Sequence, residues 1–214
     1  EEIGNREYWL LSWYLGESYQ TPFLNNAKKK IEELKGASIV VDVNSYLQNS
    51  AVTLEKVFVN NEVFHLVRDP RKVVPSIFTR RDDDKVHKIP KNSVEISKWF
   101  QMNKLQQVCY NWVQTTNNLM ETNARLIKFE DITSDYNYLK EHVLNPIGAN
   151  ISYEQFENFR KIKINRTRGW LYRYLYAKYK RKAFVNENAN FKDFSDEQKE
   201  MFFDICGPTM EKLS

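Results

Sequence analysis

The sequence predicts an α/β fold in three layers, in which helices cover a parallel sheet and the C-terminal half is helix-rich. Strands are predicted at residues 37–43, 63–67 and 125–129, and the first is a β-branched run without the alternation of a half-exposed strand. Such runs are typical of strands buried on both faces of a parallel sheet. Apolar residues at helical spacing lie between the predicted strands, and strands separated by helices indicate this architecture.

Two helices are expected before the first apolar run. Apolar side chains over residues 5–19 predict a mostly buried helix that ends near Gly16. Thr21 and Pro22 then predict a new helix start, with a cap residue followed by proline at the first helical position. A further helix is expected over residues 46–59, between the first two strands.

The longest predicted helix spans residues 93–121, after a charged loop over residues 82–91. Its apolar positions recur at alternating steps of three and four residues, which forms one buried stripe. The stripe consists of Met102, Leu105, Cys109, Trp112, Thr116 and Leu119.

Shorter elements are expected after the third strand. Helices are predicted at residues 136–144 and 153–162, and a loop at 184–194. The residues from Ser195 form a cap sequence for a last helix, which Gly207 and Pro208 should kink or interrupt.

Length and composition describe one globular domain over residues 1–214. Hydrophobic residues make up 42% of the chain and aromatic residues 14%, which excludes a disordered protein. No apolar run approaches the roughly 18 residues of a membrane span. The net charge of +4 suits an anionic partner but does not choose among nucleotide, acidic glycan and nucleic acid.

Cysteine and histidine give no sign of a metal site. Cys109 and Cys206 lie in apolar helical patterns, and we expect two buried free thiols. The three histidines are scattered, with no second ligand at metal-binding spacing.

The junction between the second strand and the next helix is the strongest candidate site. Asp69 is a plausible N-cap and Pro70 a plausible first helical residue, so free backbone N–H groups should face the crevice beyond the strand. Arg68 and Arg71 flank this point, and guanidinium groups hold phosphate through paired hydrogen bonds. The alternative is a structural turn whose arginines pair with surface carboxylates.

The residues of this junction resemble the 3′-phosphate-binding motif of the sulfotransferase family. Residues 66–71 read Leu-Val-Arg-Asp-Pro-Arg and are followed by Ser76. The helix with Cys109 and Trp112 resembles the family's Cys-x-x-Trp helix, and residues 126–132 are similar to its strand that ends in Phe-Glu-Asp. The last helix is also similar, so the resemblance covers roughly residues 38–214.

The resemblance implies a P-loop-NTPase-like fold and a metal-independent enzyme. Such an enzyme moves a sulfuryl group from 3′-phosphoadenosine 5′-phosphosulfate (PAPS) to a hydroxyl or amine of a carbohydrate or small-molecule acceptor. Arg68 and Ser76 match the residues that bind the 3′-phosphate, and Arg71 matches the second arginine of the motif. The resemblance implies neither a nucleic-acid partner nor membrane contact. Oligomeric state and compartment stay open; a cytoplasmic location is favoured over the secretory lumen.

The chain also departs from the family pattern. The family binds the 5′-phosphosulfate with a Gly- and Ser/Thr-rich loop, which we expect upstream of residue 1, in a chain truncated at its N-terminus. The general base then falls on Glu1, Glu2 or Glu7, with Glu2 the first choice, while Asp42 is a substitute at a strand end. Pro75, just before Ser76, is expected to bend the helix.

Two other functions remain open. An ATP-dependent P-loop kinase would need a Gly-Lys-Ser/Thr loop upstream and a Mg²⁺-binding carboxylate, for which Asp42 is the candidate. A non-catalytic nucleotide- or nucleic-acid-binding module of the same fold would need neither. The pair Glu130 and Asp131 is interpreted as structural, holding the strand end against neighbouring helices.

Overall fold

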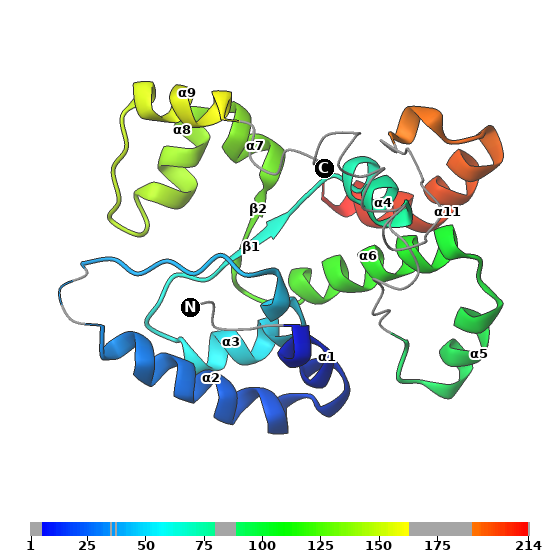
Figure 1. Cartoon of the computed structure of the whole chain (residues 1–214), viewed down its shortest axis with the longest axis horizontal. Helices are drawn as coiled ribbons and strands as arrows, with labels where there is room; N and C mark the ends of the chain where they lie inside the picture. The colour runs from blue at the N-terminus through cyan, green and yellow to red at the C-terminus, as the bar shows by residue number, and fades with distance from the viewer. Residues whose placement is uncertain (1–5, 35, 37, 80–88, 163–189, 214) are drawn as a thin grey trace, which may run out of the picture.

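A small parallel sheet lies among helices in the computed structural model of this chain (Figure 1). Strands β1 (Phe64–Val67) and β2 (Arg125–Lys128) pair in parallel, with Phe64 beside Arg125 and Val67 beside Lys128. The α/β class is therefore correct in its coarse sense, although helices dominate. The structure describes residues 6–34, 36, 38–79, 89–162 and 190–213.

The first predicted strand, at residues 37–43, is wrong. Residues 39–43 have no regular secondary structure, and the apolar side chains there range from 40% exposed at Ile39 to 79% at Val43. Among the described residues, no backbone hydrogen bond joins this segment to β1, which pairs with β2 alone. A β-branched run forms a buried strand only where a neighbouring strand and covering layers accept it.

The N-terminal helices build one hydrophobic cluster. Helices α1 (Arg6–Leu15) and α2 (Glu17–Glu32) are separated at Gly16, whose φ of 66° favours glycine, so the predicted end of the first helix is confirmed. The predicted restart at Thr21 and Pro22 is wrong, because Pro22 lies inside α2. A 3₁₀ helix η1 (Ser45–Ser50) and α3 (Ala51–Val57) replace the helix predicted over 46–59. The buried members of the cluster are Tyr8, Leu24, Leu47, Val57 and Phe58.

The helices after β1 build the second cluster. They are α4 (Pro70–Phe78), α5 (Ser93–Gln101) and α6 (Lys104–Met120). The single helix predicted over 93–121 is wrong in one respect, because the chain leaves the helical conformation at Met102. Asn103 then starts α6 with a capping box that includes Gln106. The predicted stripe is confirmed from Leu105 onward, where its members are buried.

Short helices follow β2. Helix α7 (Phe129–Ser134) begins directly at the end of the strand, so no loop separates them. It is followed by α8 (Tyr136–Leu139), the π-helical turn η3 (Lys140–Leu144) and α9 (Tyr153–Lys161), as the predictions for 136–144 and 153–162 require. 

The last helix packs along α6. After the 3₁₀ turn η4 (Phe191–Asp193), α11 (Asp196–Lys212) starts with a capping box of Ser195 and Gln198, as predicted. The predicted interruption at Gly207 and Pro208 is wrong, because α11 runs through both residues. Residues 82–88 and 184–189, parts of two predicted loops, lie outside the described residues.

The second cluster fixes the end of β1. Its buried residues come mainly from α4, α6 and α11, and Val67 of β1 belongs to it. In Figure 1 the strands cross the middle of the molecule, with α1–α3 below them, α4, α6 and α11 to the right, and α7–α9 at the upper left. The carboxyl end of β1 therefore lies between the second cluster and α7. Cys109 and Cys206, both buried, are free thiols in this cluster, as predicted.

Candidate functional site

The turn from β1 into α4 has the predicted local structure. Asp69 is the N-cap of α4, and its carboxylate accepts a hydrogen bond of 2.8 Å from the Arg71 N–H. Pro70 is the first helical residue, where a missing N–H costs nothing. The sequence of this turn is therefore sufficient to define where the helix begins.

The expected free amides at this helix end are not available, which corrects the prediction. The N–H groups of Lys72 and Val73 donate to the Asp69 carbonyl oxygen at 2.9 and 3.2 Å, and the cap takes the Arg71 N–H. Proline has no N–H, so the first turn has satisfied its own donors. An anion at this junction would depend on side chains.

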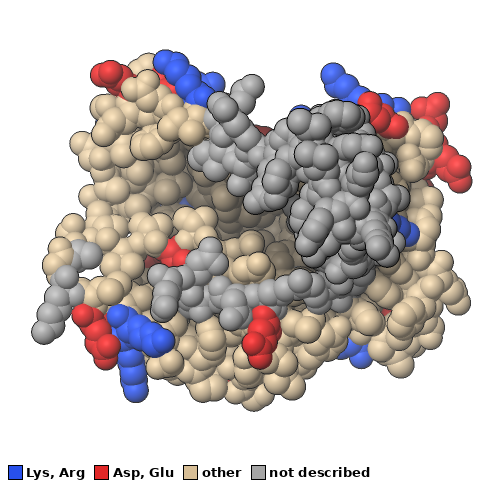
Figure 2. Space-filling model, in the orientation of Figure 1, with Lys and Arg blue, Asp and Glu red and all other residues tan. Residues whose placement is uncertain are grey.

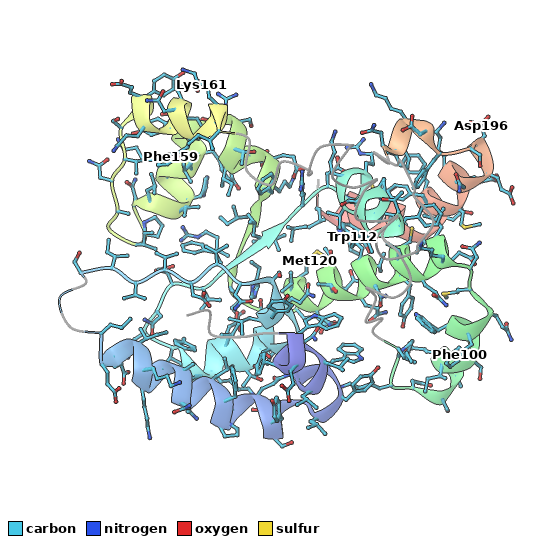
Figure 3. The ribbon with its side chains drawn as sticks, in the orientation of Figure 1. Phe100, Trp112, Met120, Phe159, Lys161 and Asp196 are labelled. Atoms are coloured by element: carbon cyan, nitrogen blue, oxygen red, sulfur yellow. The ribbon has the colours of Figure 1, made fainter. Side chains whose placement is uncertain are left out.

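The peptide unit between Arg68 and Asp69 is held at both ends. Its carbonyl oxygen accepts a hydrogen bond of 3.3 Å from the indole nitrogen of Trp112 on α6. Its N–H donates to both carboxylate oxygens of Glu130 on α7, each at 3.3 Å. In Figure 3 Trp112 lies between α6 and α4. The turn after β1, α6 and α7, all of which carry motifs noted in the sequence, thus meet at one peptide unit. We call it the clamped peptide.

The side chain of Arg68 stands over α7. Its guanidinium carbon is 4.8 Å from the centre of the Phe129 ring, and its Nε is 3.9 Å from a Glu130 carboxylate oxygen. The side chain is 52% exposed. An ion pair at this distance and exposure contributes about 0–1 kcal/mol, so solvent and ligands can still reach the guanidinium.

Arg71 is paired within its own turn. Its Nε donates to the two Asp69 carboxylate oxygens at 3.0 and 2.9 Å, and its Nη2 lies 2.8 Å from one of them. This carboxylate raises the pKa of Arg71 above its ordinary value, first through the hydrogen bond and then through its charge. A phosphate that recruits Arg71 must compete with Asp69, so Arg71 matches the structural alternative for this turn.

Ser76 lies on the exposed side of α4, beyond the buried Pro75. No described residue forms a hydrogen bond with its hydroxyl. It is seven residues after the cap, which corresponds to about 10 Å along the helix axis. One anion that contacts both Arg68 and Ser76 must therefore lie along the side of α4 rather than at its end.

Lys72 is a residue that the sequence analysis did not consider. It is exposed and precedes Ser76 by four positions, so the two side chains share one face of α4. The spacing of four residues between Lys72 and Ser76 could have predicted from the sequence that both lie on one face of the helix. An anion along this side of the helix would meet the Lys72 ammonium group as well.

The candidates for the general base lie elsewhere. Glu1 and Glu2 lie outside the described residues. Glu7 is exposed at the start of α1, and Asp42 is exposed in the irregular segment before η1. Glu130, interpreted as structural, does hold the end of β1 through the clamped peptide.

Charge and cavities give less information than the junction itself. In Figure 2 charged side chains of both signs are scattered over the visible face, most of them near its edge, without one continuous basic area among the described residues. A pocket of about 430 Å³ lies at the far end of α4, lined by Phe78, Lys104 and Met201 among others. Within the described ranges, no group of three or more His, Cys, Asp or Glu could hold a metal ion. Nor do those ranges contain a helix of the length and hydropathy that crossing a membrane requires.

The comparisons with known proteins identify no family. The resemblance of residues 66–76 to a 3′-phosphate-binding motif therefore depends on the residues themselves and on their placement at the end of β1. No family model, no curated protein and no solved structure matches this chain.

Proposed function

We propose that this protein is a PAPS-dependent sulfotransferase with a P-loop-like fold, in which Arg68 and Ser76 bind the nucleotide 3′-phosphate. The acceptor would be a hydroxyl or amine of a carbohydrate or small molecule. The observation that carries the proposal is the clamped peptide, where Trp112 and Glu130 hold the backbone of Arg68 from two sides.

The location of the clamped peptide supports this function. In parallel α/β sheets, ligands bind beyond the carboxyl ends of the strands, and Arg68 directly follows β1. Arg68 rests on the Phe129 ring with its guanidinium half-exposed. Because the backbone is fixed and the side chain is supported, the site loses less conformational entropy when a ligand binds.

The arrangement also changes the proposed binding mode. Because the first amides of α4 are satisfied, the phosphate would be held by side chains, namely Arg68, Ser76 and, as an addition, Lys72. Arg71 would contribute only if the phosphate displaced it from Asp69. The transfer itself requires an in-line attack by the acceptor on sulfur, with a base that removes the acceptor proton. Glu2 is our proposed base.

The proposal is tested by comparing two adenine nucleotides that differ in one phosphate. Adenosine 3′,5′-bisphosphate should bind more tightly than adenosine 5′-monophosphate, measured by calorimetry, and Arg68→Ala should remove that preference. Charge-assisted hydrogen bonds contribute about 1.5–3 kcal/mol, so the expected loss is about 10- to 100-fold.

Arg160→Ala is the matched control. Arg160 on α9 is also a half-exposed arginine over a phenylalanine ring, Phe156, and beside a glutamate, Glu157. Its removal should leave both affinities unchanged. Equal binding of the two nucleotides by the wild-type protein would refute the proposal, as would equal effects of the two arginine substitutions. Bisphosphate binding without transfer of labelled sulfuryl from PAPS would instead indicate the non-catalytic module.

A further inference from the structure

Glu130 contacts one group that the proposed phosphate would use, the Arg68 guanidinium, and a backbone N–H beside it. Its carboxylate accepts the Asp69 N–H and lies 3.9 Å from Nε of Arg68. The Asp69 carboxylate binds the other N–H and the other guanidinium of this junction, both from Arg71. It does not bind the Asp69 N–H or the Arg68 guanidinium, which contact Glu130 instead. Glu130 is thus a negative charge of the protein itself in the place where a negative ligand would come.

Both contacts of Glu130 are long. The hydrogen bonds from the Asp69 N–H measure 3.3 Å, against a usual value of about 2.9–3.0 Å. The side chains of Arg68 and Glu130 are 52% and 43% exposed, so water screens their attraction. An incoming phosphate can therefore take Arg68 away from Glu130 without breaking the bond to the Asp69 N–H.

We propose that Glu130 is a positioning residue with two separable effects on the proposed 3′-phosphate site, an inference that rests on the proposed function. Its oxygen atoms hold the clamped peptide and so orient Arg68. Its charge opposes the bound phosphate and competes for Arg68, which weakens binding. Glu130 then sets the affinity for the spent nucleotide at a level that permits release.

Two substitutions separate these effects. Glu130→Gln keeps an oxygen for the Asp69 N–H and removes the charge, so adenosine 3′,5′-bisphosphate should bind about fivefold more tightly, as expected for one charge several ångströms away in a solvated site. The gain should shrink as salt is added, because screening weakens exposed charges. Glu130→Ala removes the oxygen as well, and binding should fall below that of the wild-type protein.

Asp131→Asn is the matched control. It removes the same charge from the next residue of α7, whose carboxylate lies near Tyr138 rather than at the clamped peptide. We expect a change of less than about twofold, since this half-buried charge forms no ion pair with Arg68 among the described residues and salt screens it. Urea unfolding of each variant shows whether the fold is kept.

The outcomes distinguish this inference from the proposed function. The inference is overturned if the wild-type protein prefers the bisphosphate over adenosine 5′-monophosphate but Glu130→Gln binds it equally or more weakly. It is also overturned if Asp131→Asn tightens binding as much as Glu130→Gln does. A wild-type protein without that preference refutes the proposed function, and this inference with it.

Discussion

Replacing Trp112 with phenylalanine tests the clamped peptide directly. The substitution removes the indole N–H that donates to the Arg68 carbonyl oxygen at 3.3 Å, and it shortens a side chain that is 8% exposed. A hydrogen bond of this length contributes about 0.5–1 kcal/mol, toward the low end of the usual range. The atoms lost from the core contribute about 1–2 kcal/mol more. We expect a loss of about 1.5–3 kcal/mol in the free energy of unfolding, or about 3–12 °C in Tm.

Urea denaturation followed by circular dichroism measures this loss, and Trp99→Phe is its control. Trp99 on α5 is buried to a similar degree, at 5% exposure, but its ring packs edge-on against Phe100 of its own helix. Both variants should lose stability, while only Trp112→Phe should weaken binding of adenosine 3′,5′-bisphosphate. A loss below about 0.5 kcal/mol for Trp112→Phe would refute the geometry, because it is smaller than the hydrogen bond alone. Equal weakening of ligand binding by both variants would refute the positioning role.

Three further results are expected. Ser195→Ala should cost about 1 kcal/mol of stability in urea, because Ser195 forms the capping box of α11; no loss would contradict that cap. Burial lowers the pKa of His65 below 6.5, and the charge of Glu55 partly offsets this. The neutral imidazole therefore contributes to the free energy of unfolding above pH 6.5, and this contribution is lost as the pH falls. As the pH is lowered from 6.5, the urea concentration at the unfolding midpoint should therefore decrease by more in the wild-type protein than in His65→Gln. Parallel pH profiles of the two proteins would count against this. The pKa of Cys206 is raised by its hydrogen bond with Cys109 and by burial, so Ellman's reagent at pH 8 should modify these thiols only on unfolding; rapid labelling of the folded protein would show that α6 and α11 are not packed as described.

Local signals in the sequence predicted local structure well. The caps at Asp69 and Ser195 were predicted because their side chains satisfy donors only two or three residues away. The stripe that includes Cys109 and Trp112 was predicted because helical spacing and burial coincide on α6. The break at Asn103 was missed although the signal was present, since Asn103 and Gln106 have capping-box spacing inside the apolar pattern.

Predictions that depended on neighbours were less successful. The run from Ile39 to Val43 has strand composition, but no described strand lies beside it. Pro208 should end a helix on local grounds, yet α11 continues, with Cys206 buried in the cluster that includes α6 and the Thr209 hydroxyl donating to Asn117 of α6. Tertiary packing therefore stabilises α11 despite Pro208, whereas the run from Ile39 to Val43 has no neighbouring strand among the described residues to pair with.

The candidate site divides in the same way. Arg68, Asp69 and Pro70 were identified from one short segment. Glu130 was assigned a structural role, but its contact with Asp69, across 61 positions of the chain, could not be predicted without the fold. The satisfied amides of α4 were also missed, because Asp69 uses its carbonyl oxygen as well as its carboxylate.

The long-range contacts of the clamped peptide have a consequence for the order of folding. The contacts that hold the clamped peptide span 44 and 61 positions, whereas the backbone hydrogen bonds inside the surrounding helices join residues about four positions apart. Closing a loop of about 60 residues costs about 4 kcal/mol of chain entropy before any contact offsets it. We therefore expect the junction to form late, after the helices that surround it. Substitutions there should accelerate unfolding more than they slow folding, so the lifetime of the native state would depend on the same peptide unit that orients Arg68.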